Sequence, residues 1–277
     1  MKSYPTIDGP ININKITWLA DEAVKNYLKD LFIMVVVHGP ARLGKSSYVS
    51  LSCAETYEIV RLINIKFDEY AQGKDVHEID VRKKKVKIYQ QMKQDNVEIY
   101  PDWNAVKEFF VFKPREFIRI SRKISSKKPM VIMDDSGKWL NAKDHASRFV
   151  KSVTKNLETL GTAWGTLVFT CKNMRQLVSL ARDDPDVYTI HIYDWSQYSK
   201  DGLMPQRRIA KVHKGWESED TKKSGKKWID QNPYYAWMND EFYQWYKEKR
   251  DALCNEGFIQ IERELDRLIE EGDVQFE

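Results

Sequence analysis

Eight consecutive residues have the types and spacing of a phosphate-binding loop: Gly39, Pro40, Ala41, Arg42, Leu43, Gly44, Lys45 and Ser46. Such a loop needs glycines because its backbone N–H groups turn inward around an anion, in conformations that a Cβ obstructs. A lysine at this position reaches the β- and γ-phosphates of a nucleotide, and the serine hydroxyl binds Mg²⁺. The pattern predicts these roles for Lys45 and Ser46, with Ser47 adding a contact to the α-phosphate.

Two acidic residues follow a second apolar segment. Asp134 and Asp135 come directly after Met130–Met133. The carboxyl ends of buried parallel strands form the edge at which open α/β sheets bind ligands. We therefore expect Asp134 to hold the Mg²⁺, directly or through water, and Asp135 to orient or deprotonate an attacking water. Together the two motifs predict binding and hydrolysis of Mg-ATP.

Each motif also has a purely structural interpretation. The first can be a glycine-rich turn with a surface lysine, and the acids can cap a helix beyond Ser136. A buried carboxylate is costly, however, unless it meets a metal ion or a hydrogen-bond donor. The two motifs also occur in the expected order, about 90 residues apart. Their combination favours the catalytic interpretation.

The surrounding pattern predicts an α/β protein, a three-layer parallel-sheet P-loop NTPase with a helical, aromatic-rich C-terminal extension. Apolar positions at helical spacing predict helices, and short runs that are apolar on both faces predict buried parallel strands. Their alternation favours a parallel sheet covered on both faces. We expect helices over 18–32 and 141–160, and strands over 33–37, 129–133, 165–170 and 187–193.

The remaining segments are less regular. We expect residues 1–195 to form the ATPase core, with an elaborated, mainly helical insertion over 60–128 that includes a short helix and strand over 103–112 and a helix over 114–127. Residues 196–277 are expected to form the C-terminal extension. Within it, 207–212 can pair with the fourth strand as a hairpin, 218–227 is a polar linker or flexible tip, and two helices cover 239–255 and 257–272.

With both motifs placed, residues 18–195 resemble the additional-strand P-loop ATPases, which include AAA+ proteins, RecA-like motors and FtsK/HerA pumping ATPases. The resemblance implies a further strand between the two motif strands. It also implies that Asp135, where this family usually has glutamate, is the catalytic base. Because aspartate is shorter by one methylene, water positioning can differ and hydrolysis can be slow. The compact size and the C-terminal part look like ATPases encoded by archaeal viruses or plasmids.

The same resemblance implies two further site residues. A polar sensor ends the strand next to the one that carries the acids, which implies that Thr170, or Asn173 three residues later, contacts the γ-phosphate or the attacking water. In ring-forming members an arginine from a neighbouring subunit completes the site. The segment before the fourth strand implies this role for Arg182, and a surface arginine is the alternative.

Composition places the chain among folded proteins. Of its 277 residues, 42% are hydrophobic and 31% are charged, which is typical of globular proteins. The three cysteines, Cys53, Cys171 and Cys254, form no CxxC pair, so neither a metal cluster nor a disulfide framework is indicated. No apolar run approaches the roughly 20 residues that span a bilayer, and the N-terminus has no apolar signal core. We expect a cytoplasmic protein, in the host cytoplasm if a virus or plasmid encodes it, without membrane insertion.

The net charge of +4 does not by itself indicate a nucleic-acid partner. The family resemblance and basic stretches near aromatic residues favour a ring-forming homo-oligomer that acts on nucleic acid, DNA above all, in genome packaging, replication or DNA transfer of a mobile element. The basic stretches are 82–87, 122–128, 207–208 and 222–227. Solvated surface lysines are the structural alternative. A nucleoside or nucleotide kinase and a slow, nucleotide-gated scaffold are the competing functions.

Overall fold

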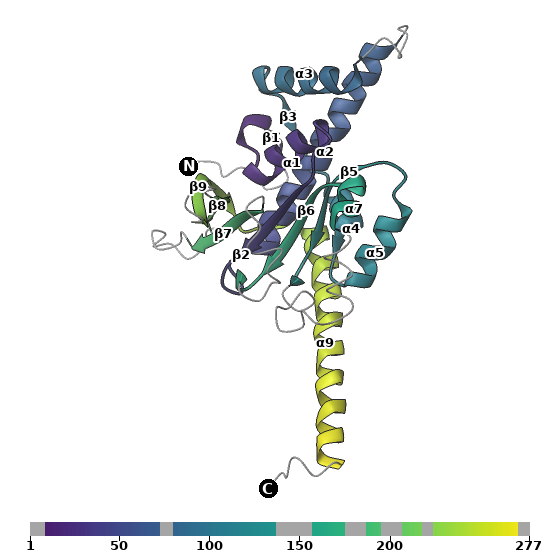
Figure 1. The fold of residues 1–277 in the computed structure, drawn as a ribbon, viewed down its shortest axis with the longest axis vertical. Helices are drawn as coiled ribbons and strands as arrows, with labels where there is room; N and C mark the ends of the chain where they lie inside the picture. The colour runs from purple at the N-terminus through teal and green to yellow at the C-terminus, as the bar shows by residue number, and fades with distance from the viewer. Residues whose placement is uncertain are drawn as a thin grey trace. The chain divides into compact units, whose positions relative to one another are not determined.

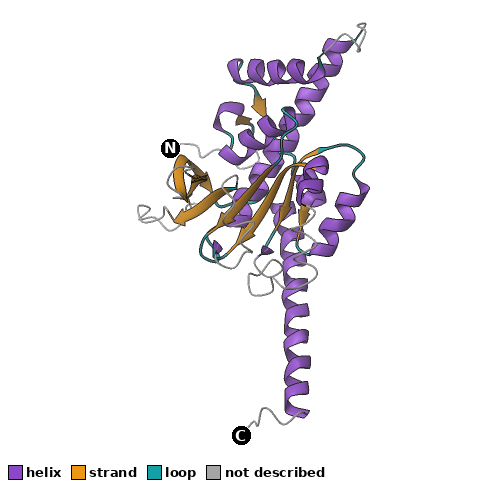
Figure 2. Ribbon diagram, viewed as in Figure 1, coloured by secondary structure: helices purple, strands orange, loops and turns teal. Residues whose placement is uncertain are grey.

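A seven-stranded sheet forms the centre of the protein (Figures 1 and 2). The structure is a computed structural model that describes residues 9–72, 80–136, 157–174, 187–194, 207–217 and 224–270. The strand order is β4-β5-β6-β2-β7-β8-β9. The strands are β2 (Ile33–His38), β4 (Phe110–Val111), β5 (Lys128–Met133), β6 (Trp164–Cys171), β7 (Tyr188–Asp194), β8 (Arg207–Glu217) and β9 (Ser224–Tyr235).

The first five strands in this order run parallel, and β8 and β9 are added antiparallel to β7 and to each other. All eight residues of β6 are buried, as expected for a strand covered on both faces. The four strands predicted from apolar runs are confirmed, as is the pairing of 207–212 with the fourth strand. The sheet continues past residue 195, because β8 and β9 extend it.

Helices pack on both faces of the sheet (Figure 2). These helices are α1 (Trp18–Leu28), α2 (Lys45–Ala71), α4 (Trp103–Phe109), α5 (Pro114–Lys123) and α7 (Leu157–Ala163), and a further helix, α3 (Val81–Gln94), packs on α1 and α2. One hydrophobic cluster joins α4 and α5 to β5 and β6 through Phe109, Phe117, Val131 and Trp164. A second joins α1, α2 and α3 through Ala20, Ile59 and Met92. Near it lie a 3-10 helix, η1 (Ile13–Lys15), and a two-stranded sheet of β1 (Ile11–Asn12) and β3 (Glu98–Ile99).

The insertion predicted over 60–128 is largely helical. The helix after the glycine loop extends to Ala71, and α3 crosses it away from the main sheet (Figure 1). The short helix and strand predicted over 103–112 are α4 and β4, and the helix predicted from Pro114 is α5. Most of the helix predicted over 141–160 lies outside the described residues.

Two predictions for the C-terminal part need correction. The segment 218–227, predicted to be a linker or flexible tip, ends in a strand, because β9 begins at Ser224 and pairs with β8. The two predicted final helices are one helix, α9 (Asp240–Glu270). A single glycine costs a helix only about 1 kcal/mol relative to alanine, and Gly257 has open space around its α-carbon, so the helix continues through it.

The chain divides into two compact units, Met1–Met238 and Asn239–Glu277. The described part of the second unit is mainly α9, which exposes Phe258, Ile261 and Leu265 at spacings of three and four residues. Within the described ranges, no helix is both long and apolar enough to cross a bilayer.

A buried polar contact joins the start of α1 to α2. The Thr17 hydroxyl caps α1 by accepting from Ala20 N, and the Glu55 carboxyl group accepts from the Thr17 backbone N–H at 2.9 Å. Glu55 is only 1% exposed. Burial raises the pKa of its carboxyl group to about 7, although the Thr17 bonds act in the opposite direction. Near pH 5 the folded protein therefore keeps this group neutral.

This contact predicts a pH dependence of stability. The pKa of Glu55 is higher in the folded state than its ordinary value of 4.5, so the folded state binds more protons and loses stability as the pH rises from about 4.5 to 7. Between pH 5 and pH 8, the free energy of unfolding of the wild type should fall by about 2 to 3 kcal/mol relative to Glu55→Gln. Urea unfolding at several pH values measures this difference. Parallel pH profiles of the two proteins would show that Glu55 is not the group responsible.

Candidate nucleotide-binding site

The glycine loop connects the end of β2 to the start of α2. Gly39 has a φ of 147°, and a Cβ on it would lie 2.9 Å from the Ile192 carbonyl oxygen of β7. Gly44 has a φ of 84° and caps α2, and a Cβ there would lie 2.6 Å from the Ala236 Cβ. Both glycines are therefore required by conformation and by space. The N-terminus of α2 faces this loop, which is the arrangement that attracts anions.

Lys45 and Ser46 form the first turn of α2. The Lys45 ammonium group donates to the carbonyl oxygens of Gly39 and Pro40, at 3.0 and 2.9 Å. This places the ammonium group against the loop's own backbone, at the position from which it can contact a phosphate. The Ser46 hydroxyl donates to the Asp134 carboxylate, with its oxygen 3.1 Å from Oδ1 and 3.2 Å from Oδ2. The two predicted motifs are thus in direct contact.

Asp134 lies at the carboxyl end of β5, with only 1% of its surface exposed. Its Oδ1 also accepts from the Thr170 hydroxyl of β6, at 2.5 Å. Its backbone N–H donates to the Val111 carbonyl oxygen of β4, at 2.9 Å. Three elements, α2, β6 and β4, therefore fix the position of this carboxylate.

Asp135 follows in a left-handed conformation, with a φ of 48°. Its backbone N–H donates to the Thr170 hydroxyl oxygen, at 2.9 Å, and the next residue, Ser136, donates its hydroxyl to the Thr170 carbonyl oxygen, at 2.8 Å. The turn directs Asp135 away from the line of β5, and its side chain is only partly buried. Thr170 is fully buried, and it holds both acidic residues at once.

The oxygen atoms gathered here suit a magnesium ion. Mg²⁺ prefers oxygen ligands and is usually bound through one or two carboxylates, with phosphate and water oxygens completing the octahedron. Ser46 and Asp134 supply a hydroxyl and a carboxylate within hydrogen-bond distance of each other. Among the described residues, no group of three or more His, Cys, Asp or Glu side chains forms a protein-only metal site. The residues therefore fit a metal that is shared with a nucleotide.

The other predicted site residues fall in different places. Pro40, Ala41 and Arg42 are exposed on the loop, and Ser47 is half-buried in the first turn of α2. Arg42 has a φ of 64°, which adds strain to the loop. Asn173 is exposed just beyond the end of β6. Arg182 lies outside the described residues.

A contact between the loop and β9 was not predicted from the sequence. The Tyr234 hydroxyl donates to the Gly44 carbonyl oxygen, at 2.9 Å, and its ring packs edge-on against Tyr48 of α2, with 4.9 Å between ring centroids. The aromatic content of the C-terminal part was the only signal in the sequence. Tyr234 thus supports the backbone of the loop at Gly44, although the two residues are 190 positions apart in the sequence.

A row of rings also starts beside the loop. The His38 ring at the end of β2 lies 4.5 Å from that of His191 on β7, which stacks on Tyr193 at 4.0 Å, centroid to centroid. Burial, and then the nearby His191 and Lys226, lower the pKa of His38 to about 3. At neutral pH the imidazole of His38 is therefore uncharged and adds no positive charge to the site.

Strand order, glycine loop and acidic strand end together define a P-loop NTPase fold. No family model matches the sequence, and no curated protein is significantly similar to it. Among solved structures, the chain is similar to the ATPase domain of G40P, with 12% identity over 71% of this chain and 80% of that chain, and a TM-score of 0.31. It is also similar to a KaiC-like protein from the hyperthermophilic archaeon Pyrococcus horikoshii, with 12% identity, 73% and 89% coverage, and a TM-score of 0.31. Both likenesses are distant, so we base the function on the geometry of this chain.

Proposed function

We propose that this chain is a magnesium-dependent ATPase of the additional-strand division of P-loop proteins. The observation that carries the proposal is the contact of Ser46 with Asp134, which joins the glycine loop to the acidic end of β5. The strand order supports the division, because β6 lies between β5 and β2 and pairs in parallel with both.

In this proposal each residue of the site has one task. The loop's backbone N–H groups bind the phosphates, and Lys45 exchanges its contacts with the Gly39 and Pro40 carbonyls for the β- and γ-phosphate oxygens. Ser46 and Asp134 hold Mg²⁺, which when bound neutralises phosphate charge. Asp135 accepts a proton from the attacking water and orients it. Thr170 keeps the two acids at a fixed separation, because its hydroxyl binds one and accepts from the other.

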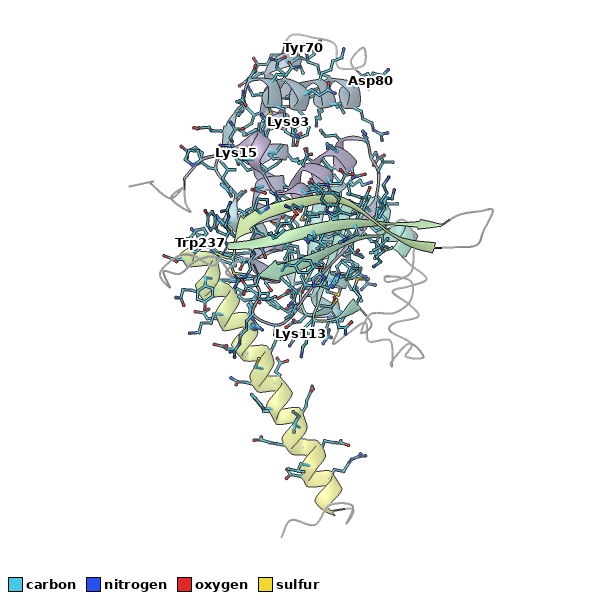
Figure 3. The ribbon with its side chains drawn as sticks, turned by 90° about the vertical axis from the view of Figure 1, so that its left-hand side faces the viewer. Lys15, Tyr70, Asp80, Lys93, Lys113 and Trp237 are labelled. Atoms are coloured by element: carbon cyan, nitrogen blue, oxygen red, sulfur yellow. The ribbon has the colours of Figure 1, made fainter. Side chains whose placement is uncertain are left out.

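We further propose that hydrolysis drives a nucleic-acid motor or remodeller, in genome packaging, replication or DNA transfer of a mobile element. Not every basic stretch supports this. Arg208 is 2% exposed and forms an ion pair with Asp194 at 2.6 Å, so it is a structural residue. In α3, Arg82 pairs with Asp30, and the Lys84 ammonium group lies 3.4 Å from the Tyr70 ring centroid (Figure 3 labels Tyr70). These three cations therefore give the nucleic-acid proposal little support.

The first test is ATP turnover by the purified chain. Lys45→Ala should abolish hydrolysis, because it removes the cation that contacts the β- and γ-phosphates. Asp135→Asn should keep nucleotide binding but lower turnover by roughly 10² or more, as expected for loss of a general base. Release of inorganic phosphate measures both, with Lys66→Ala, an exposed lysine of α2, as the matched control.

If Lys45→Ala hydrolysed ATP at the wild-type rate, the assignment of the glycine loop as the ATPase site would be wrong. Slow turnover in the wild type that no polynucleotide accelerates would favour the nucleotide-gated scaffold, to which the short Asp135 side chain is suited. Acceleration by single-stranded DNA, double-stranded DNA or RNA would favour the motor. Transfer of the γ-phosphate to a nucleoside or nucleotide would favour the kinase.

We also propose that the active form is a ring in which Arg182 of one subunit completes the site of the next. The exposed Phe258, Ile261 and Leu265 of α9 support self-association, because apolar residues at spacings of three and four form helix-packing seams. An arginine supplied across an interface can raise turnover by about 10³ or more.

A mixing experiment tests the shared site. Arg182→Ala subunits and Lys45→Ala subunits should each be inactive alone and regain part of the wild-type turnover when mixed, because mixed interfaces pair an intact loop with an intact arginine. Sedimentation velocity shows whether the proteins assemble. Full activity of Arg182→Ala alone, at a specific rate that does not change with protein concentration, would exclude the trans-acting role.

A further inference from the structure

Helix α5 presents two chemically different faces. Phe117 is 2% exposed, and Ile120 and Ile124 pack beside it against the cluster around Trp164. The Trp164 indole N–H also donates to the Ser121 hydroxyl, at 3.0 Å. These inward contacts fix the rotation of α5 about its axis, so the opposite face has a defined direction. α5 contacts the edge strand β4, and Figure 1 shows it on the side of the sheet away from β7, β8 and β9.

That opposite face is basic. Arg115, Ile118, Arg119 and Arg122 are exposed and recur at i, i+3, i+4 and i+7, which places them on one side of a helix. Lys123 follows them and is also exposed. We call Arg115, Ile118, Arg119 and Arg122 the α5 basic face.

Among the described residues, no acidic side chain forms a salt bridge with this face. The only acid within α5, Glu116, accepts from the backbone N–H groups of Phe112 and Lys113, at 3.0 and 3.2 Å. Its carboxylate is therefore engaged at the start of the helix. In the part of the chain that the structure describes, the salt bridges involve none of the three arginines, in contrast to Arg82 and Lys83 of α3.

The spacing of the three arginines suits a polyanion. From Arg115 to Arg122 the helix rises by about 10 Å, a length over which one strand of a duplex carries about three phosphates. Planar guanidinium groups bind phosphate oxygens in pairs, which makes arginine the preferred residue for such contacts. Three such groups of one sign repel each other, and a row of phosphates removes that repulsion.

The same helix is tied to the acidic end of β5. α5 begins at Pro114, shortly after β4, and the Val111 carbonyl oxygen of β4 accepts the Asp134 N–H at 2.9 Å. Only Phe112 and Lys113 separate β4 from α5. The α5 basic face is therefore connected to the backbone of Asp134, the residue proposed to hold magnesium, through two residues of chain and one hydrogen bond.

We propose that the α5 basic face is the surface on which this ATPase binds the phosphate backbone of a nucleic acid. The inference rests on the proposed motor function, for which it supplies the contact surface. It assigns sequence-independent binding to Arg115, Arg119 and Arg122, with little role for the basic residues of α3.

The test compares two variants that lose the same number of positive charges. Arg115→Gln/Arg119→Gln/Arg122→Gln removes the α5 basic face while keeping good helix formers. Lys66→Gln/Lys83→Gln/Lys87→Gln, the matched control, removes three exposed lysines of α2 and α3. Binding of fluorescein-labelled single-stranded and double-stranded 30-mers is measured by anisotropy over a range of salt concentrations. ATP turnover without nucleic acid is measured in parallel.

The arginine variant should bind either DNA at least tenfold more weakly, and the slope of log K against log salt should fall by about 2 to 3, since each lost phosphate contact removes about 0.7 to 0.9. The control should bind within about threefold of the wild type. Turnover without DNA should be unchanged in both. If the triple variant misfolds, Arg119→Gln alone should lower the slope by about 1.

Binding by the arginine variant within twofold of the wild type, or an equal loss in the control, would overturn this inference and leave the ATPase intact. A wild type that hydrolyses ATP but binds neither DNA would overturn both the inference and the motor proposal. A change in sedimentation without a change in DNA binding would make the α5 basic face a subunit contact, and would also overturn the inference.

Discussion

Asp134 carries its carboxylate inside the protein, and the surrounding elements are arranged so that this group is satisfied. A buried carboxylate without partners costs several kcal/mol. Here the hydroxyls of Ser46 and Thr170 donate to it, from the start of α2 and from β6. The contact exists only if β5, β6 and β2 end at the same edge of one parallel sheet. Carboxylate and hydroxyl oxygens are ligands that suit Mg²⁺.

The additional strand explains how the two acids acquire different surroundings. β6 lies between the strand of the loop and the strand of the acids, so Thr170 is within reach of both acidic residues. It donates to Asp134 and accepts from the Asp135 N–H. The left-handed turn at Asp135 then leaves the second carboxyl group only partly buried, where water can reach it. One threonine thus holds two neighbouring acids in different surroundings, which fits the separate roles proposed for them.

Local patterns in the sequence predict the part of the site that local physics determines. The glycine loop requires glycine at fixed positions, and buried strands such as 33–37 and 165–170 are continuous apolar runs, so both were predictable.

Contacts between distant segments were not predictable from the sequence. Tyr234 supports Gly44 only because β8 and β9 extend the sheet, and the polar composition of 218–227 concealed the start of β9. Gly257 misled the helix prediction, because a solvent-exposed glycine lowers helix stability without ending the helix. The role proposed for α5 depends on which basic side chains form ion pairs with acidic ones, and the sequence alone does not show this.

The most direct test measures whether Asp134, oriented by Thr170, is the ligand of a metal ion at a site that a nucleotide completes. Manganese, a spectroscopic substitute for magnesium, is titrated with a non-hydrolysable ATP analogue, and unbound Mn²⁺ is followed by electron paramagnetic resonance. The wild type should bind one Mn²⁺ per nucleotide. Asp134→Asn should lose most of this binding, and Thr170→Val should weaken it by about tenfold or more, as expected when the group that orients a metal ligand is removed. Equal Mn²⁺ affinity in all three proteins would contradict the assignment of Asp134 as the magnesium ligand.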